Sequence, residues 1–255
     1  MKIITKLLLP TVLLGMVQCD QHVEISEGAI IRGDTRFKEL SIVFTGDEFS
    51  DGGFYIAEVL KKRDIMAAFF FTGNFYRNAD NEPLISDLRS SGHYLGAHSD
   101  RHLLYCDWDN RDSLLVDFET FSSDLHDNYE AMKQFGISKD EAKYFLPPYE
   151  WYNSKISAWC QQLGIQLINY TPGTLSHTDY TTPECSNYRS SREIFDSILD
   201  YESSNENGLN GFILLLHIGS SPDRTDKFYC LMDDLIDELI NRNYSFHRID
   251  RLFVL

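Results

Sequence analysis

Short, continuous apolar runs alternate with amphipathic segments along most of this chain. The runs LSIVFT (40–45), AAFFFTG (67–73) and GFILLLHIG (211–219) are rich in β-branched and aromatic residues, as buried strands are. Between the first two lies YIAEVLKKRD (55–64), whose apolar residues recur at helical spacing. Strands that are apolar throughout need cover on both faces. The pattern therefore predicts an α/β fold with a parallel sheet covered by helices, either closed as a barrel or open.

The same alternation continues towards the C-terminus. Further helices are expected in PLISDLRSSG (83–92), residues 114–136, NSKISAWCQQLG (153–164), REIFDSILDYES (192–203) and YCLMDDLIDELINRN (229–243). Further strands are expected in YLGAHS (94–99), YFLPPY (144–149), IQLINYT (165–171) and SFHRI (245–249). Neither a repeat nor a low-complexity linker interrupts them. A chain of 255 residues with 43% hydrophobic content suits one domain, which we expect over residues 39–255.

The N-terminal stretch MKIITKLLLPTVLLGMVQC has the features of an export signal. Lys2 and Lys6 precede an apolar run, 7–17, that is too short to span a bilayer. Cys19 stands where a bacterial lipoprotein signal places its lipidated cysteine, although Gln18 replaces the usual small residue; ordinary cleavage near 18–22, or none, stays open. We expect a lipoprotein-type signal peptide over 1–19 and a tether over 20–38. The expected location is the bacterial cell envelope, with membrane contact only through the lipid anchor.

Charge and cysteine content narrow the possible partners. The formal net charge is −16 and the acidic residues are spread along the chain, which argues against nucleic acid as a partner because phosphate binding depends on Lys and Arg. Four cysteines follow the predicted signal, and an exported protein could pair them in several ways. They are Cys106, Cys160, Cys185 and Cys230. Their pairing and the oligomeric state stay open.

Polar clusters follow the predicted strands where each strand ends. They are TGDE (45–48), HSDRH (98–102), PPYEWY (147–152), TPGTLSHTDY (171–180) and HIG (217–219). In parallel α/β folds, ligands and catalytic groups collect at the carboxyl ends of the strands. We therefore expect all five clusters on one rim of the sheet.

His98 and His102 lie four residues apart in one of these clusters. Neutral imidazoles suit zinc, and a carboxylate from a neighbouring strand would complete a site with two histidines and one carboxylate. An isolated HxxxH pattern is also typical of an ordinary polar turn. The position on the rim and the acidic pair in TGDE favour the metal site.

Taken in order, VFTGDE, AAFFFTG, HSDRH, FLPPYEWYN, DY and ILLLHIG resemble the polysaccharide deacetylase family, also called the NodB-homology domain or carbohydrate esterase family 4. HSDRH matches the family's H-[ST]-x-x-H motif in full, and the resemblance spans roughly residues 40–250. It implies a distorted (β/α) barrel. It also implies metal-dependent removal of N- or O-linked acetyl groups from a carbohydrate polymer or oligosaccharide.

The resemblance also implies roles for individual residues. Asp47 takes the position of the general base and His217 that of the general acid, and the backbone N–H of Tyr149 would stabilise the oxyanion. One divalent ion, zinc with cobalt or nickel as alternatives, would be held by Glu48, His98 and His102, with Asp47 as the alternative carboxylate. A competing alignment on FSDG (49–52) would make Asp51 the ligand; we disfavour it because Asp51 precedes a predicted helix that it could cap.

The polar cluster PPYEWY (147–152) is expected to contact the sugar. Its residues are Pro148, Glu150, Trp151 and Tyr152. Aromatic side chains beside a cleft suit stacking on a sugar ring, and burial in the core is the alternative. Asp179 stands where the family carries an aspartate that orients the acid.

Two positions depart from the family pattern. Leu146 replaces the arginine that usually accompanies the base, and Gly46 replaces a phenylalanine. Two alternative functions therefore stay open. One is a catalytically impaired, glycan-binding envelope lipoprotein, and the other is a metal-dependent hydrolase of another amide or ester on the same scaffold.

Overall fold

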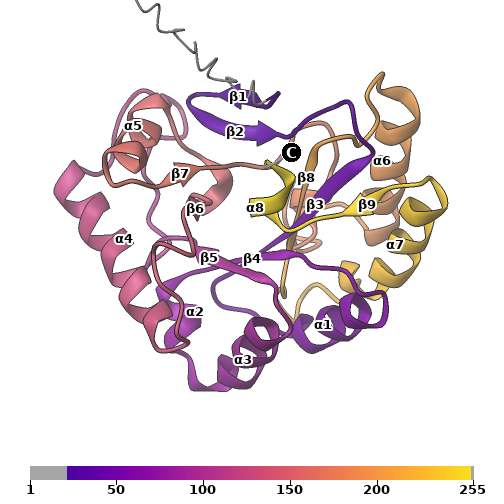
Figure 1. Ribbon diagram of the computed structural model, residues 1–255, viewed down its shortest axis with the longest axis horizontal. Coiled ribbons are helices and arrows are strands. Elements are labelled where there is room, and N and C mark those ends of the chain that lie inside the picture. Colours follow the sequence, from indigo (N-terminus) through magenta and orange to yellow (C-terminus); the bar gives the residue numbers. More distant parts are fainter. Residues whose placement is uncertain (1–21, 254–255) are drawn as a thin grey trace, which may run out of the picture.

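The computed structural model describes residues 22–253, in which helices surround a curled sheet (Figure 1). The strands are β1 (Glu24–Ser26), β2 (Ala29–Arg32), β3 (Glu39–Gly46), β4 (Ala68–Phe71), β5 (Tyr94–Ala97), β6 (Tyr144–Phe145), β7 (Gln166–Leu167), β8 (Phe212–His217) and β9 (Ser245–Phe246). The α-helices are α1 (Gly53–Lys62), α2 (Gly73–Arg77), α3 (Glu82–Ser90), α4 (Phe118–Lys133), α5 (Ser154–Gln162), α6 (Ser191–Ser204), α7 (Met232–Asn241) and α8 (Ile249–Leu252). Short 3₁₀ helices span Ala79–Asn81, Pro148–Glu150, Ser176–Thr178 and Phe228–Leu231. The predicted signal peptide and Cys19 lie outside the described residues.

The sheet has the order β1-β2-β8-β3-β4-β5-β6-β7, and β9 adds to β3. The strand pairs from β8 to β7 are parallel, whereas β2 runs antiparallel to β1 and β8. Ile30 forms a parallel bridge with Ile168 just beyond β7, so the sheet curls until its two sides touch. The prediction of a distorted barrel of parallel strands is confirmed. None of the helices in residues 22–253 is both long and apolar enough to cross a membrane.

Residues 22–38, the described part of the expected tether, contribute two strands to the sheet. These strands, β1 and β2, form a hairpin that joins β8. Arg32 at the end of β2 is buried, and its guanidinium donates to the carbonyl oxygens of Asn210 and Gly208, each at 2.8 Å. The run AIIR is too short to carry a clear periodic signal, and its place in the sheet depends on these contacts with a distant part of the chain.

Local capping and apolar spacing explain where the helices form. In α1, Ile56, Val59 and Leu60 recur at helical spacing and are buried, as the sequence predicted. Helix α4 starts later than the predicted start at 114, because the Asp117 carboxylate accepts a hydrogen bond from the Thr120 amide and so caps the helix there.

The strand register brings the carboxyl ends of the central strands to one level. Direct partners across the sheet are Thr45 and His217, Gly46 and Phe71, Phe71 and Ala97, and Ala97 and Phe145. Each next residue leaves the sheet at the same rim: Asp47, Thr72, His98, Leu146 and Ile218. Below the rim, the rings of Phe44 and Phe69 stack at 5.0 Å in the core. The polar ends of the strands are thus held over a rigid apolar layer.

Acid should destabilise the fold through His93. This residue is buried, its Nδ1 accepts the Ala67 amide at 3.1 Å, and burial lowers its pKa to about 4. The unfolded chain takes up a proton near pH 6.5 and the folded chain only near pH 4. The free energy of unfolding should therefore fall as the pH drops across this window, by up to about 3 kcal/mol from this residue. Urea unfolding at pH 7 and pH 4.5 measures the loss.

A His93→Gln variant should lose less stability between these two pH values than the unchanged protein does. His126→Gln is the matched control, because the His126 side chain is 67% exposed. If the free energy of unfolding falls by the same amount in the unchanged protein and in His93→Gln, then His93 does not cause the loss of stability in acid.

Candidate active site

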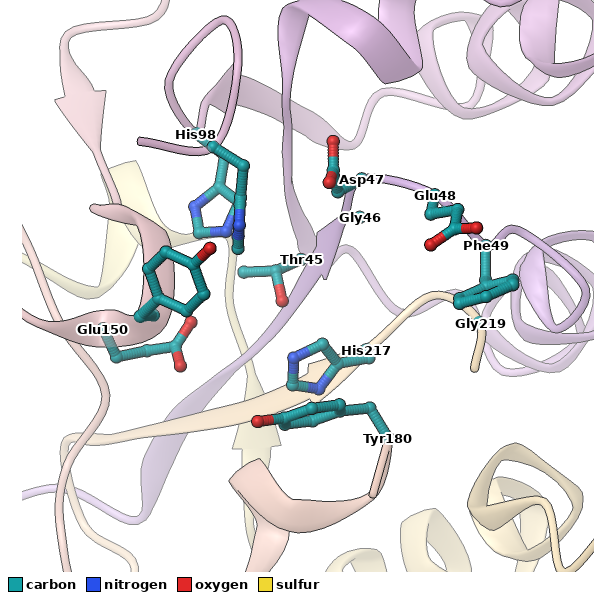
Figure 2. A pocket seen from close by; sticks show the side chains of 12 residues that line it. Thr45, Gly46, Asp47, Glu48, Phe49, His98, Glu150, Tyr180, His217 and Gly219 are labelled. Atoms are coloured by element: carbon teal, nitrogen blue, oxygen red, sulfur yellow. The ribbon is translucent and has the colours of Figure 1, made fainter. Parts of the chain in front are cut away.

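A pocket opens at the rim where the carboxyl ends of the central strands meet (Figure 2). It is lined by Thr45, Gly46, Asp47, Glu48, Phe49, His98, His102, Tyr149, Glu150, Tyr180, His217 and Gly219. All of them except Phe49, which directly follows TGDE, belong to the five predicted polar clusters, and TPGTLSHTDY contributes Tyr180 alone. None of the residues that line this pocket is a lysine or an arginine.

The two histidines of HSDRH are presented as neutral rings. His98 is buried, and its Nδ1 lies 2.8 Å from the Leu146 carbonyl oxygen. Because a carbonyl can only accept, Nδ1 carries the proton and Nε2 keeps its lone pair, as in histidines that bind metals. The His102 ring lies 5.1 Å from that of His98, centroid to centroid. Burial lowers the pKa of both histidines, so both are neutral at pH 7.

The buried Asp124 of α4 shapes the loop that carries both histidines. Its carboxylate accepts hydrogen bonds from Ser99 Oγ at 2.6 Å, from the Asp100 amide at 3.0 Å and from the Arg101 amide at 3.2 Å. Ser99 and His102 have positive φ angles of 72° and 55°, which this loop must hold against their steric cost. We did not identify Asp124 from the sequence; its one signal is a charge on the apolar face of α4, beside Phe121 and Leu125.

The two acidic residues after β3, Asp47 and Glu48, point in different directions and differ in exposure. Asp47 is half-buried, and its Oδ1 accepts the Thr72 hydroxyl at 2.7 Å. Glu48 is exposed, and Figure 2 shows it beside Phe49, on the side of Asp47 that faces away from His98. Among residues 22–253, no three His, Cys, Asp or Glu side chains are grouped closely enough to form a ready-made metal site. The choice of metal carboxylate is therefore part of the proposal below.

Asp51 does not cap the helix that follows it, which corrects the reason that we gave for disfavouring it as a ligand. Helix α1 is capped by Gly52 without a side-chain hydrogen bond. The Asp51 carboxylate instead accepts the Ser220 amide at 2.8 Å and pairs with Lys227 Nζ at 2.9 Å. It ties the loop after β3 to the loop after β8, outside the set of residues that line the pocket.

His217 at the end of β8 is held by Asp179. The Asp179 carboxylate accepts the His217 amide at 2.9 Å and contacts His217 Nδ1 at 2.6 Å. Burial alone would lower the pKa of His217, but the charge of Asp179, its hydrogen bond to the ring and the charge of Glu150 together outweigh burial, and the pKa is raised. The Tyr180 ring covers the imidazole at 4.5 Å. The arrangement leaves Nε2 as the nitrogen that can exchange a proton with a bound molecule.

The loop after β6 is strained where it enters the pocket. Tyr149 and Glu150 have consecutive positive φ angles of 59° and 53°, a conformation that costs about 1–3 kcal/mol for each such residue. The Tyr149 ring lies 4.4 Å from that of His102. Burial raises the pKa of Glu150 to about 7, with the charge of His217 opposing and that of Asp179 adding to the shift. The pocket thus holds a carboxyl group that titrates near neutral pH.

Of the four residues predicted to contact a sugar, one lines the pocket and three do not. Glu150 lines the pocket, whereas Pro148 is buried and does not. Tyr152 is 1% exposed, and its hydroxyl donates to the Ser26 carbonyl oxygen at 3.0 Å, so the prediction that it contacts the substrate is wrong. Trp151 is half-buried and lies outside the set that lines the pocket. Tyr152 belongs to the core because it packs under the β1–β2 hairpin, which sequence reasoning did not place.

The two departures from the family pattern have structural consequences. The Leu146 side chain is fully buried, and only its carbonyl serves the site, through His98. A Cβ at position 46 would lie 2.7 Å from Ile218 Cγ2 and 2.9 Å from Phe71 Cδ1, so a larger residue there would force one of these buried side chains to move. The hydroxyl of Thr72, which we did not single out although it directly follows β4, is the partner that the structure gives Asp47.

Several other side chains stay outside the pocket. His177 is half-buried and stacks on Tyr170 at 5.0 Å. The cysteines within the described residues form no disulfide: Cys106 and Cys160 are buried and free, and Cys185 and Cys230 are exposed and free.

Comparison with known proteins identifies the family. The family model described as polysaccharide deacetylase matches residues 34–168. An uncharacterized 30.6 kDa protein of Geobacillus stearothermophilus is 26% identical over 227 residues, which cover 88% of this chain and 74% of that protein. The peptidoglycan-N-acetylmuramic acid deacetylase PdaA of Bacillus subtilis is 26% identical over 221 residues, 84% of this chain and 72% of PdaA.

Solved structures agree on the fold. The structure of PdaA, a family 4 carbohydrate esterase, superimposes with a TM-score of 0.68 at 21% identity, covering 89% of this chain and 85% of that one. A second, BA3943 of Bacillus anthracis, described as a family 4 pseudoenzyme, gives a TM-score of 0.69 at 16% identity, covering 90% of this chain and 70% of that one. The curled parallel sheet, the histidine pair after β5 and the family model together show that this chain belongs to the polysaccharide deacetylase family.

Proposed function

We propose that this protein removes acetyl groups, N- or O-linked, from a carbohydrate polymer or oligosaccharide by metal-dependent hydrolysis. The observation that carries the proposal is the meeting, in one pocket, of a neutral histidine pair and a histidine that is held by a buried aspartate. The name of the relative PdaA supports a glycan of the bacterial envelope as the substrate and action outside the cytoplasm. The predicted export signal, with lipidation at Cys19, agrees with that location.

The donor set suits one divalent ion, with zinc as the first choice. His98 and His102 offer imidazole nitrogens, and the His98–Leu146 hydrogen bond leaves Nε2 of His98 available. Glu48 is exposed and lines the same pocket, so its long side chain is free to turn towards the histidines. We propose these three as the ligands. When bound, such an ion supplies Lewis-acid polarisation of the acyl carbonyl and lowers the pKa of a water molecule.

Two side chains are proposed to transfer protons, one as base and one as acid, and a backbone N–H is proposed to stabilise the oxyanion. Asp47 accepts the proton of the attacking water, and the Thr72 hydroxyl orients its carboxylate for that role. His217 donates a proton from Nε2 to the leaving amine or alcohol, while Asp179 stabilises the protonated imidazole. The Tyr149 backbone N–H, on the strained loop, is the proposed donor to the oxyanion.

A second candidate function is glycan binding without turnover. It is favoured by the buried leucine at position 146, which leaves no cation among the residues that line the pocket to support the base. The likeness to a protein described as a pseudoenzyme is in keeping with it.

Acetate release by the purified protein from N-acetylated and O-acetylated glycans decides between the two. We expect release that a chelator abolishes and that added zinc restores, because the water that attacks depends on the ion for its acidity. The same chelator and zinc treatment with heat-inactivated protein is the control. A protein that binds one ion per chain and binds the glycans, but releases no acetate, would favour the second candidate.

A further inference from the structure

An aromatic surface adjoins the pocket on a loop that the reaction scheme does not use. Trp108 is 55% exposed and lies in the loop between β5 and α4. Its ring stacks on Trp151 at 5.6 Å with an interplanar angle of 30°, and it meets Tyr149 edge-on at 5.6 Å and 78°. Tyr149 is itself 43% exposed and lines the pocket. Two successive ring contacts therefore lead from Trp108 to His102.

The ring beneath Trp108 is fixed from several sides. The Arg111 guanidinium lies 4.6 Å from the Trp151 ring centroid, and Trp151 Nε1 donates to the Asp107 carbonyl oxygen at 3.1 Å. Asn153 Nδ2 donates to the Arg111 carbonyl oxygen at 2.9 Å. These contacts join the loop that carries Trp108 to the loop after β6. Trp108 is thus presented on a preorganised support and not on a loose loop tip.

The loop has its own internal order as well. The Asp107 side chain accepts the amides of Asp109 and Asn110, each at 2.9 Å, which closes a turn around Trp108. Cys106 pairs with Leu114 in an antiparallel bridge at the base of the loop. This loop is ordered, yet it leaves a large indole exposed to solvent, where the indole forgoes the free energy that burial in the core would give. Such exposed aromatic side chains on an ordered support are typical of a binding surface.

We propose that Trp108 and Tyr149 form a subsite for the sugar residue next to the one whose acyl group enters the pocket. The inference rests on the proposed function in one respect, namely that the occupant is a glycan chain. One face of a pyranose ring consists of C–H groups and stacks on an indole or phenol ring as other apolar groups do. Through this subsite the protein favours oligomeric glycans over single sugars.

The test compares long and short substrates in Trp108 variants. The probes are the hexamer of β-1,4-linked N-acetylglucosamine, acetylated xylohexaose and the corresponding monomers. With Trp108→Ala we expect kcat/KM for a hexamer substrate to fall about tenfold, mainly through KM, and kcat/KM for the monomer to stay unchanged. Trp108→Leu, which keeps apolar packing on Trp151 without a flat ring, should behave like Trp108→Ala. Trp108→Phe should retain most of the preference.

Phe37→Ala is the matched control. Phe37 is also an exposed aromatic residue that faces a guanidinium, with Arg36 at 5.5 Å, but it precedes β3 and so lies at the other end of the sheet from the pocket. It should leave both substrates unaffected. Thermal unfolding of each variant shows that the fold is kept.

Calorimetric binding of the same hexamers with chelator present separates this inference from the proposed function. If the unchanged protein releases no acetate but binds a hexamer more tightly than Trp108→Ala does, the proposed function fails and the subsite stands. The inference is overturned if the unchanged protein and Trp108→Ala bind both hexamers equally, or if neither binds them. Equal losses of kcat/KM for hexamer and monomer also overturn it.

Discussion

Replacing Asp47 by asparagine will lower acetate release by about 10²–10⁴-fold, the range that a general base contributes. Asparagine has nearly the same shape and can still accept the Thr72 hydroxyl, so the change removes the basic oxygen with little effect on packing. We expect the variant to retain its metal ion, because the proposed ligands are Glu48, His98 and His102. Initial rates of acetate release and the metal content per chain are the two measurements.

Glu48→Gln is the matched comparison, since it changes the neighbouring carboxylate in the same way. We expect it to raise the zinc concentration that is needed for half-maximal activity. The opposite pattern, in which Asp47→Asn loses the ion and Glu48→Gln keeps it, would assign the metal carboxylate to Asp47. Full activity in Asp47→Asn would contradict both roles for Asp47.

The second large effect is expected from Asp179→Asn. Asp179 holds His217 through both its carboxylate oxygens and raises the pKa of the imidazole against the effect of burial. With a neutral partner, the pKa of His217 should fall, and less of it is protonated at pH 7. We expect kcat to drop by about 10²-fold or more, and the alkaline limb of the pH profile to move to lower pH. The measurement is kcat between pH 5 and pH 9.

Asp223→Asn is the control for this prediction, because Asp223 is exposed on the loop that follows β8. It should leave the pH profile unchanged. A loss of activity in Asp179→Asn without any shift of the alkaline limb would mean that Asp179 supports the backbone of His217 and does not set the protonation of its ring.

Much of the site could be predicted because its signals are local. The apolar runs around Ile42, Phe70 and Leu215 identify buried strands, and polar residues that follow such strands must emerge at one rim if the strands are parallel. This reasoning placed Asp47, His98 and His217 together, and the structure brings all three to one pocket. Thr72 obeys the same rule and could have been found by applying it to β4.

Other features needed the folded chain. β2 is a four-residue strand whose partners come from β1 and from β8, far along the chain. Tyr152 was expected to contact the sugar because it is an aromatic residue in a segment placed at the rim, yet it is buried against the hairpin that β2 completes. Trp108 escaped notice because nothing in its own segment shows that Trp151 will lie beneath it.

The sequence by itself determined the alternation of the central strands and helices, the rim and the residue types that meet there, because apolar periodicity is a signal carried by neighbouring residues. The tertiary structure decided which of these groups can act. Asp124 shapes the histidine loop, Asp179 sets the charge of His217, and Asp51 is drawn away to Lys227. Such pairings join residues far apart in the chain, and only packing determines which polar groups are close enough to pair.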